Sequence, residues 1–179
     1  MLIIGFKRRA LLASFFLILI MAQSVAFAIG KADLWYRTGF DYSQKGNNDK
    51  AFSYMLRAAD SGHTAAQNNI GLSYLHGLGV EKDENKAFIW FEKAAKKGLK
   101  YAQNELGMLY QRQGNDIKAQ RWWSIAANAD DEYAQFNLAS LFLQQKKIKK
   151  AYYWFKQANE NQHPQAQMAL NELKKMEVE

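Results

Sequence analysis

The chain has 179 residues, of which 49% are hydrophobic and 23% charged, with a formal net charge of +7 and a sequence pI of about 9.5. It contains no cysteine, which excludes disulfides, thiol catalysis and cysteine-ligated zinc. A chain of this length and composition is one compact domain or one short repeat array, and its stability must come from packing alone.

The first 28 residues have the pattern of a secretory signal peptide. A basic segment at positions 7–9 precedes an uncharged apolar stretch over 10–25, and Ala26-Phe27-Ala28 matches the small-x-small cleavage pattern. We therefore expect a periplasmic or secreted protein whose mature chain begins at Ile29. An uncleaved N-terminal anchor is the alternative, although the apolar stretch is shorter than the roughly 20 residues that span a bilayer comfortably.

Removal of the three basic residues of that segment leaves 21 basic and 17 acidic residues, a net charge of about +4. Export argues against a nucleic-acid partner. A mildly basic exported chain instead favours an acidic protein or an anionic surface as its partner.

Residues 34–177 carry an internal repeat, which is the strongest pattern in the sequence. The pair Ala-Gln recurs with steps of 36, 32 and 32 residues, and several other sets of positions keep the same register. These sets are the small residues Gly39, Gly71, Gly107 and Ala139, the aromatics Tyr74 and Tyr110, the alanines Ala87, Ala119 and Ala151, and the tryptophans Trp90, Trp122 and Trp154.

Spacings of three, four and seven residues place these side chains on one face of a helix. We expect each unit to be a pair of helices, A then B, which approach at the small residues while the aromatic side chains, the tryptophans included, fill the core. The predicted fold is an all-α solenoid of four helix-turn-helix repeats with a C-terminal capping helix. A generic four-helix bundle is the alternative. The expected bounds are 34–63, 64–100, 101–130 and 131–162 for the units and 163–177 for the cap, after a linker over 29–33.

Glycines and acidic residues mark the expected turns. Gly46 and Gly114 stand where helix A should end, and Asp49 and Asp116 where helix B should begin. Pro164 suits the first turn of the capping helix.

The unit from Ala66 to Gly98 resembles the Sel-one-like repeat, a subclass of the tetratricopeptide superfamily. The residues that carry the resemblance are Ala66-Gln67, Ile70-Gly71, Tyr74, Gly77-Leu78-Gly79-Val80, Asp83, Lys86-Ala87, Trp90-Phe91, Lys93-Ala94-Ala95 and Gly98. The resemblance implies a right-handed superhelix with a concave face and a role as an adaptor or regulator. Secreted bacterial members are associated with envelope regulation and host contact. A secreted branch linked to penicillin-like compounds pairs cysteines within each repeat, so it is a poor guide here.

By the same resemblance, three columns of helix A point into the concave groove. The candidate partner-binding residues are Tyr36, Phe40, Asn68, Leu72, Leu75, Asn104, Met108, Gln111, Arg112 and Phe136. We expect the carboxamides of Asn68 and Asn104 to hold the backbone of a bound peptide, and the apolar members to accept a side chain. His76 and Arg112 would select an acidic side chain. The alternative is that the apolar members pack between neighbouring A helices.

The sequence contains no recognisable catalytic constellation, cofactor motif or metal site. His63, His76 and His163 fall in or beside different loops, where exposed histidines are expected. The lysines between positions 146 and 150 are expected to form a solvated turn, with docking to an acidic partner or membrane surface as the alternative. The predicted function is an exported, non-enzymatic scaffold that binds a peptide or helix of another protein. The alternative is a cell-wall-associated regulator or hydrolase acting on peptidoglycan or a β-lactam-like ligand.

Overall fold

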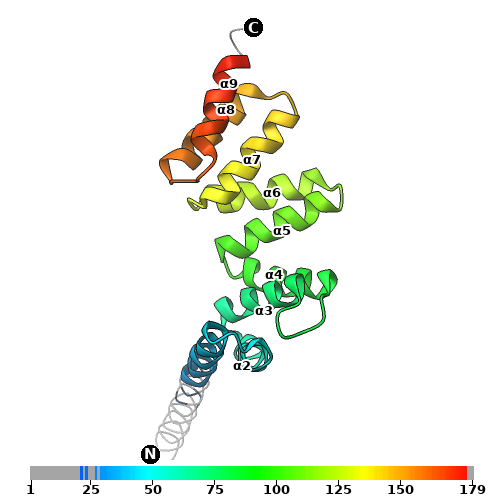
Figure 1. Ribbon diagram of the computed structural model, residues 1–179, viewed down its shortest axis with the longest axis vertical. Coiled ribbons are helices and arrows are strands. Elements are labelled where there is room, and N and C mark those ends of the chain that lie inside the picture. Colours follow the sequence, from blue (N-terminus) through cyan, green and yellow to red (C-terminus); the bar gives the residue numbers. More distant parts are fainter. Residues whose placement is uncertain (1–20, 22, 24–26, 28, 177–179) are drawn as a thin grey trace, which may run out of the picture.

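The computed structural model describes residues 21, 23, 27 and 29–176, and this part of the chain contains helices and no strand. The helices are stacked along the long axis of the molecule from the N-terminal to the C-terminal end (Figure 1). The first is described continuously over residues 29–44. The others are α2 (Asn48–Asp60), α3 (Thr64–His76), α4 (Glu84–Lys96), α5 (Lys100–Arg112), α6 (Asp116–Ala127), α7 (Glu132–Gln144), α8 (Ile148–Glu160) and α9 (Ala166–Met176). The predicted signal peptide, residues 1–28, lies outside the described residues apart from three isolated positions.

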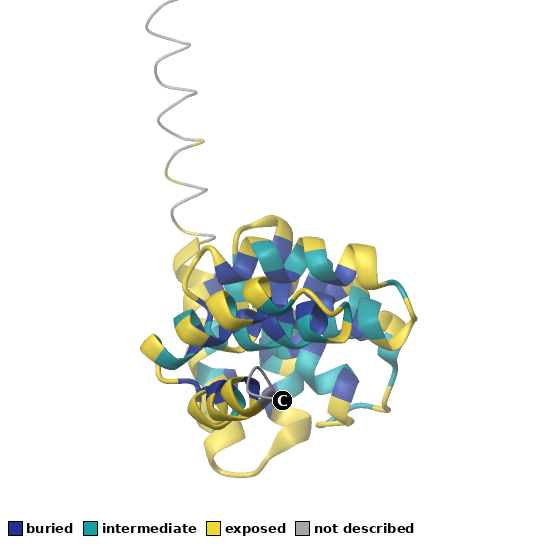
Figure 2. Ribbon diagram, turned by 90° about the horizontal axis from the view of Figure 1, so that it is seen from above, coloured by how far each residue is buried: buried dark blue, intermediate teal, exposed yellow. Residues whose placement is uncertain are grey.

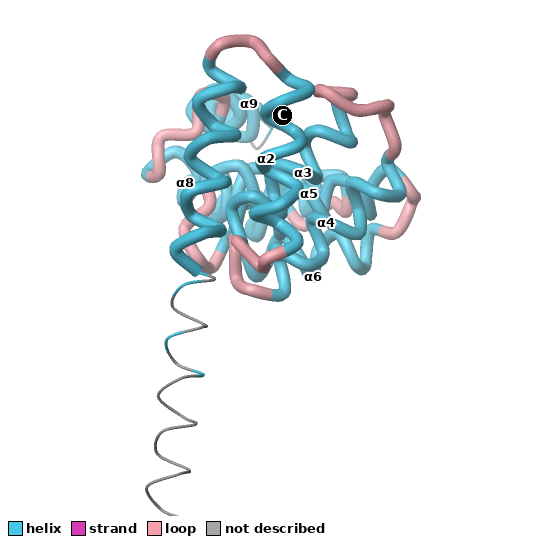
Figure 3. Tube along the Cα trace, turned by 90° about the horizontal axis from the view of Figure 1, so that it is seen from below, coloured by secondary structure: helices cyan, strands magenta, loops and turns pink. Residues whose placement is uncertain are grey.

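The helices form four successive hairpins. Helix 29–44 pairs with α2, α3 with α4, α5 with α6, and α7 with α8, while α9 covers the end of the last hairpin. Gly39 of helix 29–44 lies against Met55 of α2. From α2 onward each helix packs against the next in the chain, and α5 also touches α7. Seen along the stack, the helices wind around a common axis and the loops lie at the periphery (Figure 3). This arrangement confirms the predicted all-α solenoid of four units with a capping helix.

Two expected boundaries differ in the structure. Residues 29–33, predicted as a linker, are helical and continue into the first A helix, because Ala32 is buried and the added helical turn has no proline to stop it. The capping helix begins at Ala166 instead of residue 163. Pro164 therefore lies in the turn before that helix, where the backbone N–H of Ala166 donates to the carbonyl of His163 at 3.2 Å.

The B helix α6 begins at Asp116 as expected, and α2 begins at Asn48, one residue before Asp49. The side chains of Asn47 and Asn115 cap α2 and α6 by accepting the backbone N–H three residues on, at 3.2 and 3.1 Å. Asp49 and Asp116 lie in the first turn of those helices, where a carboxylate stabilises the positive end of the helix dipole.

The turn from helix A to helix B requires a left-handed backbone. Gly46 and Gly114 adopt φ values of 72° and 74°, and Lys146 occupies the same place in the fourth unit with a φ of 56°. The longer loop of the second unit reaches back to the first. A Cβ at Gly79 would overlap the carbonyl of Asn48, so only glycine allows this loop to rest on the start of α2.

The A and B helices of a unit meet where a glycine lies beneath an aromatic ring. A Cβ at Gly71 would lie 2.7 Å from the Phe91 ring, and one at Gly107 would overlap the Trp123 indole. Both rings are fully buried. Buried residues accordingly lie towards the middle of the stack and exposed ones around it (Figure 2). The same layer contains Gly39, Ala139, Ala87, Ala119 and Ala151, all buried.

The tryptophan column is less buried than its spacing predicted. Trp90 is 9% exposed, but Trp122 and Trp154 are only half-buried, and in each unit the most buried aromatic is the residue that follows. The reason is that Phe91 and Trp123, four positions after the repeated alanines, face the glycines of helix A. The tryptophans, three positions after those alanines, lie beside that contact. Tyr74 and Tyr110 connect consecutive units through edge-to-face contacts with phenylalanines of the preceding B helices, at 5.4 and 5.1 Å between ring centroids.

Candidate functional site

Two neighbouring hollows lie along the A helices in the middle of the solenoid. One, of about 520 Å³, involves α3, the loop after it, α5 and α7; the other, of about 450 Å³, involves α5, α7 and the turn before α9. Glu105, Met108 and Asn137 line both, so the two form one central groove across three units. The central groove is lined by Leu75, His76, Lys82, Tyr101, Asn104, Glu105, Met108, Gln111, Arg112, Tyr133, Phe136, Asn137, His163, Pro164 and Gln165.

The structure brings six of the candidate residues together in the central groove. They are Leu75, Asn104, Met108, Gln111, Arg112 and Phe136, joined by His76 at one end. Of the apolar members, Leu75 is buried, and Met108 and Phe136 are half-buried. Part of each side chain therefore packs within the protein, as the alternative interpretation held. The groove is therefore a surface of mixed apolar and polar character that crosses the A helices of units two to four.

The other four candidates lie elsewhere. Phe40 and Leu72 line a separate hollow of about 190 Å³ between helix 29–44, α2 and α3. Tyr36 stacks on His63 with 4.3 Å between ring centroids. Asn68 lines none of these hollows, and its carboxamide oxygen is buried without a hydrogen-bond partner among the residues that the structure describes. The candidate columns of the sequence therefore do not share one surface in the structure.

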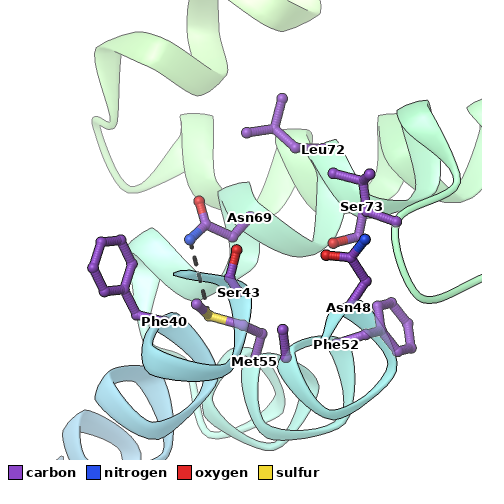
Figure 4. Close-up of a pocket in the computed structure, with 10 residues that line it drawn as sticks. Phe40, Ser43, Asn48, Phe52, Met55, Asn69, Leu72 and Ser73 are labelled. Atoms are coloured by element: carbon purple, nitrogen blue, oxygen red, sulfur yellow. Dashed lines mark hydrogen bonds between the residues drawn. The ribbon is translucent and has the colours of Figure 1, made fainter. Parts of the chain in front are cut away.

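Figure 4 shows the interior of the separate hollow. The amide nitrogen of Asn69 lies 3.9 Å from the sulfur of Met55, while Ser43 and Asn48 also face the cavity. Phe40 stands at its edge and is 47% exposed. This hollow is smaller than either part of the central groove and belongs to the junction between units one and two.

Asn104 is engaged by its neighbours. It is 7% exposed, its side-chain oxygen accepts a hydrogen bond from the amide of Asn137 at 2.9 Å, and its backbone carbonyl accepts one from the Trp123 indole at 3.2 Å. The carboxamide oxygen that was expected to hold a peptide backbone thus connects α5 to α7. Asn104 shapes the wall of the groove and fixes the spacing of two A helices.

Glu105 lies at the centre of the groove and was not among the sequence candidates. It lines both hollows, is half-buried, and forms no hydrogen bond or ion pair with any residue in the described part of the chain. Burial raises the pKa of its carboxyl group; the Arg112 guanidinium acts in the opposite direction and the Asp131 carboxylate in the same direction. The sequence contained a pattern that could have identified Glu105 as a candidate. Asn69, Glu105 and Asn137 form a further column with the repeat steps of 36 and 32 residues.

Arg112 is paired within the protein. Its guanidinium lies 3.4 Å from the carboxylate of Glu84 on α4, and both side chains are partly exposed. Its charge is therefore already compensated, which weakens the expectation that it selects an acidic side chain. Lys82 and His76 line the same end of the groove.

The opposite end of the groove is aromatic. His163 is 7% exposed and stacks on Phe136 with 4.1 Å between ring centroids, while Tyr133 meets it edge-on at 5.0 Å. Its Nδ1 accepts the backbone N–H of Gln165 at 3.2 Å. Burial lowers the pKa of His163, although the Glu132 carboxylate opposes this effect.

The expectation that the histidines are exposed loop residues is thus correct only for His76. His163 is buried by the ring that stacks on it, and half-buried His63 caps α3, with its Nδ1 accepting the backbone N–H of Ala66 at 3.1 Å. In the described ranges, no group of three histidine and acidic side chains is placed to hold a metal ion.

The lysine run lies away from the groove residues. Lys146 is in the turn and Lys147 precedes α8, but Lys149 and Lys150 belong to the first turn of that helix. Lys147 donates to the side chain of Gln145 at 2.7 Å. The run is therefore an exposed turn together with the start of a helix.

A family model described as "Sel1 repeat" matches residues 24–63, 64–99, 100–131 and 132–163, which reproduce the four hairpins. A Sel1 repeat protein from Oxalobacter formigenes is similar over 75% of this chain and 59% of its own, with 29% identity and a TM-score of 0.70. A protective antigen present in uropathogenic Escherichia coli strains, which displays an SLR fold, is similar over 76% of this chain but 32% of its own, with 28% identity and a TM-score of 0.70. This chain therefore spans about three fifths and one third of the length of these two proteins.

MamA from Desulfovibrio magneticus shares the fold alone, with 17% identity, a TM-score of 0.59, and coverage of 83% of this chain and 86% of its own. No curated protein matches the sequence. Over the residues that the structure describes, no helix is both long and apolar enough to cross a bilayer.

Proposed function

The chain belongs to the Sel1-repeat family, and on that premise we propose that its central groove holds a segment of a partner protein. Sel1 repeats are in general protein–protein interaction scaffolds. The observation that supports the groove as the contact surface is its continuity across α3, α5 and α7. A surface that spans three units is long enough to contact several consecutive residues of an extended peptide or one face of a short helix.

The chemistry of the lining suits a protein ligand. Tyr101 and Tyr133 are 52% and 47% exposed, and Met108 lies between the two parts of the groove. Tyrosine supplies a large apolar area together with a polar end at small entropic cost, and methionine adapts to side chains of different shape. Gln111 and Asn137 add donors and acceptors for peptide groups.

We propose that the protein acts outside the cytoplasm. The basic segment, the apolar stretch and the Ala-Phe-Ala pattern of residues 1–28 support export, and the absence of cysteine is compatible with an oxidising compartment. A partner would then be a protein of the cell envelope or of a host surface.

The competing role, a hydrolase of cell-wall material, would require converging acidic residues. The lining of the central groove includes one carboxylate, Glu105, while Asp131 is fully buried beneath the surface. A retaining or inverting glycosidase uses two carboxyl groups that both reach the substrate. The lining thus supports binding over hydrolysis.

Site-specific photo-cross-linking tests the proposal. A photoreactive residue at position 108 should capture a defined partner from the envelope fraction, whereas the same residue at position 117 should not. Ile117 is the matched control because it is 86% exposed on α6, outside the lining of the groove. Capture of the same partner from position 117 but not from position 108 would show that another face of the solenoid is the contact surface.

A further inference from the structure

We propose that the central groove selects its partner segment through a lysine or arginine side chain that pairs with Glu105. The inference rests on the proposed function and adds the chemistry of the ligand. It reverses the preference for an acidic segment that His76 and Arg112 indicated from the sequence.

The first reason is that Glu105 forms no ion pair with any residue that the structure describes. Its carboxylate is half-buried at the junction of the two hollows, and within the described residues no side chain or backbone group bonds to it. An ionised carboxylate that has lost part of its water without gaining a partner is in an unfavourable state. A cation brought to it from a ligand relieves that state and forms a charge-assisted hydrogen bond.

The second reason is the balance of charge around Glu105. Arg112 on the same helix also acts on Glu105, but its guanidinium lies 3.4 Å from the Glu84 carboxylate, which offsets part of its charge. Lys100, near the start of α5, donates to the carbonyl of Asp130 at 2.9 Å. The fully buried Asp131 adds a second carboxylate close enough to act on Glu105, and one of its oxygens has no hydrogen-bond partner in the described ranges. The middle of the groove therefore favours a positive group.

The third reason is the shape of the surroundings. Lysine and arginine combine a charged end with an apolar stem, and the stem needs an apolar wall. Met108 is on the same helix, one turn after Glu105, and lines both hollows, while Phe136 lies across the groove on α7. The half-exposed ring of Tyr133 is available for a cation–π contact, whereas the Tyr101 ring already has Lys100 over it at 5.5 Å.

The test is a selection from a random peptide library with three proteins: the wild type, Glu105→Gln and Glu172→Gln. Glutamine keeps the size of glutamate and removes its charge. Glu172 is the matched control because it is an exposed carboxylate on α9, outside the lining of the groove. Wild type and control should enrich peptides with lysine or arginine at one position, and Glu105→Gln should lose that preference.

Calorimetry then measures the dissociation constants of two peptides, a selected peptide and its counterpart in which that basic residue is changed to glutamine. For wild type, the change in the peptide should weaken binding about tenfold or more, which is the scale of a partly buried charge pair. For Glu105→Gln, both peptides should bind with nearly the same affinity.

Each other outcome overturns the inference in a distinguishable way. Peptides that cross-link at position 108 but show no basic preference, or an acidic one, refute the role of Glu105 and leave the groove as the binding site. If no peptide cross-links at position 108, the proposed function fails together with this inference.

Discussion

Replacement of Gly107 by alanine tests whether the contact between helices A and B depends on the absence of a side chain. A Cβ at this position would overlap the indole ring of Trp123, which is 1% exposed and has no room to move aside. Displacement of that ring also strains the hydrogen bond of 3.2 Å from its Nε1 to the carbonyl of Asn104. Gly107→Ala should therefore destabilise the fold, although alanine is the better helix former.

The size of the effect follows from three contributions. Overpacking of a well-packed core costs about 1–3 kcal/mol, and loss of the buried hydrogen bond costs about 1 kcal/mol more. Alanine offsets about 1 kcal/mol through its helix propensity. The net loss is about 1–3 kcal/mol, which lowers the Tm of a chain of this size by roughly 2–4 °C for each kcal/mol.

Thermal unfolding followed by far-UV circular dichroism is the assay, and Gly30→Ala is the matched control. Gly30 is also helical, but no atom of the described part of the chain lies within 4 Å of a Cβ placed there. That variant should melt at the wild-type temperature or slightly above it. The change Trp123→Leu should remove most of the penalty of Gly107→Ala, because the two positions are in contact. A Tm for Gly107→Ala equal to or above that of the wild type would refute this account of the interface.

Three further predictions concern the turns, the groove and the N-terminus. Lys146→Gly should raise stability by about 1 kcal/mol in a urea titration, because Lys146 holds a left-handed φ of 56° that glycine adopts freely; no gain would mean that the lysine is not strained. Burial raises the pKa of Glu105, so its contribution to stability is present below the ordinary value of 4.5 and is lost as the pH rises through the folded-state pKa. Glu105→Gln should therefore be more stable than wild type at neutral pH, and the difference should shrink on acidification towards pH 4.5; a constant difference would contradict this. N-terminal sequencing of the native protein should begin at Ile29, and recovery of an intact Met1 chain in the membrane fraction would replace cleavage with anchoring.

The repeat architecture was predictable from the sequence because its determinants are local and recur. On helix A, a small residue is followed three positions later by an aromatic one, as in Gly71 and Tyr74 or Gly107 and Tyr110. The two positions lie on one face of the helix. The spacing of these positions predicted the number of hairpins and the pairing of helices, and the residues of the second unit supplied the resemblance to the family. The helix contacts and the family match confirm these predictions. The periodicity also placed an aromatic side chain opposite each glycine. It did not distinguish Trp90 from Phe91, since residues three and four positions after an alanine share one helical face.

The central groove depended on contacts between units, which periodicity does not specify. Asn68 and Asn104 occupy equivalent positions in the sequence, yet Asn104 bonds to Asn137 across two A helices while Asn68 lines none of the hollows. Glu105 becomes the centre of the groove because α5 and α7 approach each other there and the turn with His163 covers one side.

The sequence alone thus determined the order of the helices and the pairing of each A helix with its own B helix, because these contacts lie within a unit and repeat with it. The tertiary structure decided which candidate side chains share a surface. That outcome depends on contacts between units, and these differ along the stack. Tyr36 stacks on His63 and Phe136 on His163, whereas Asn104, at the equivalent position of the third unit, bonds to Asn137.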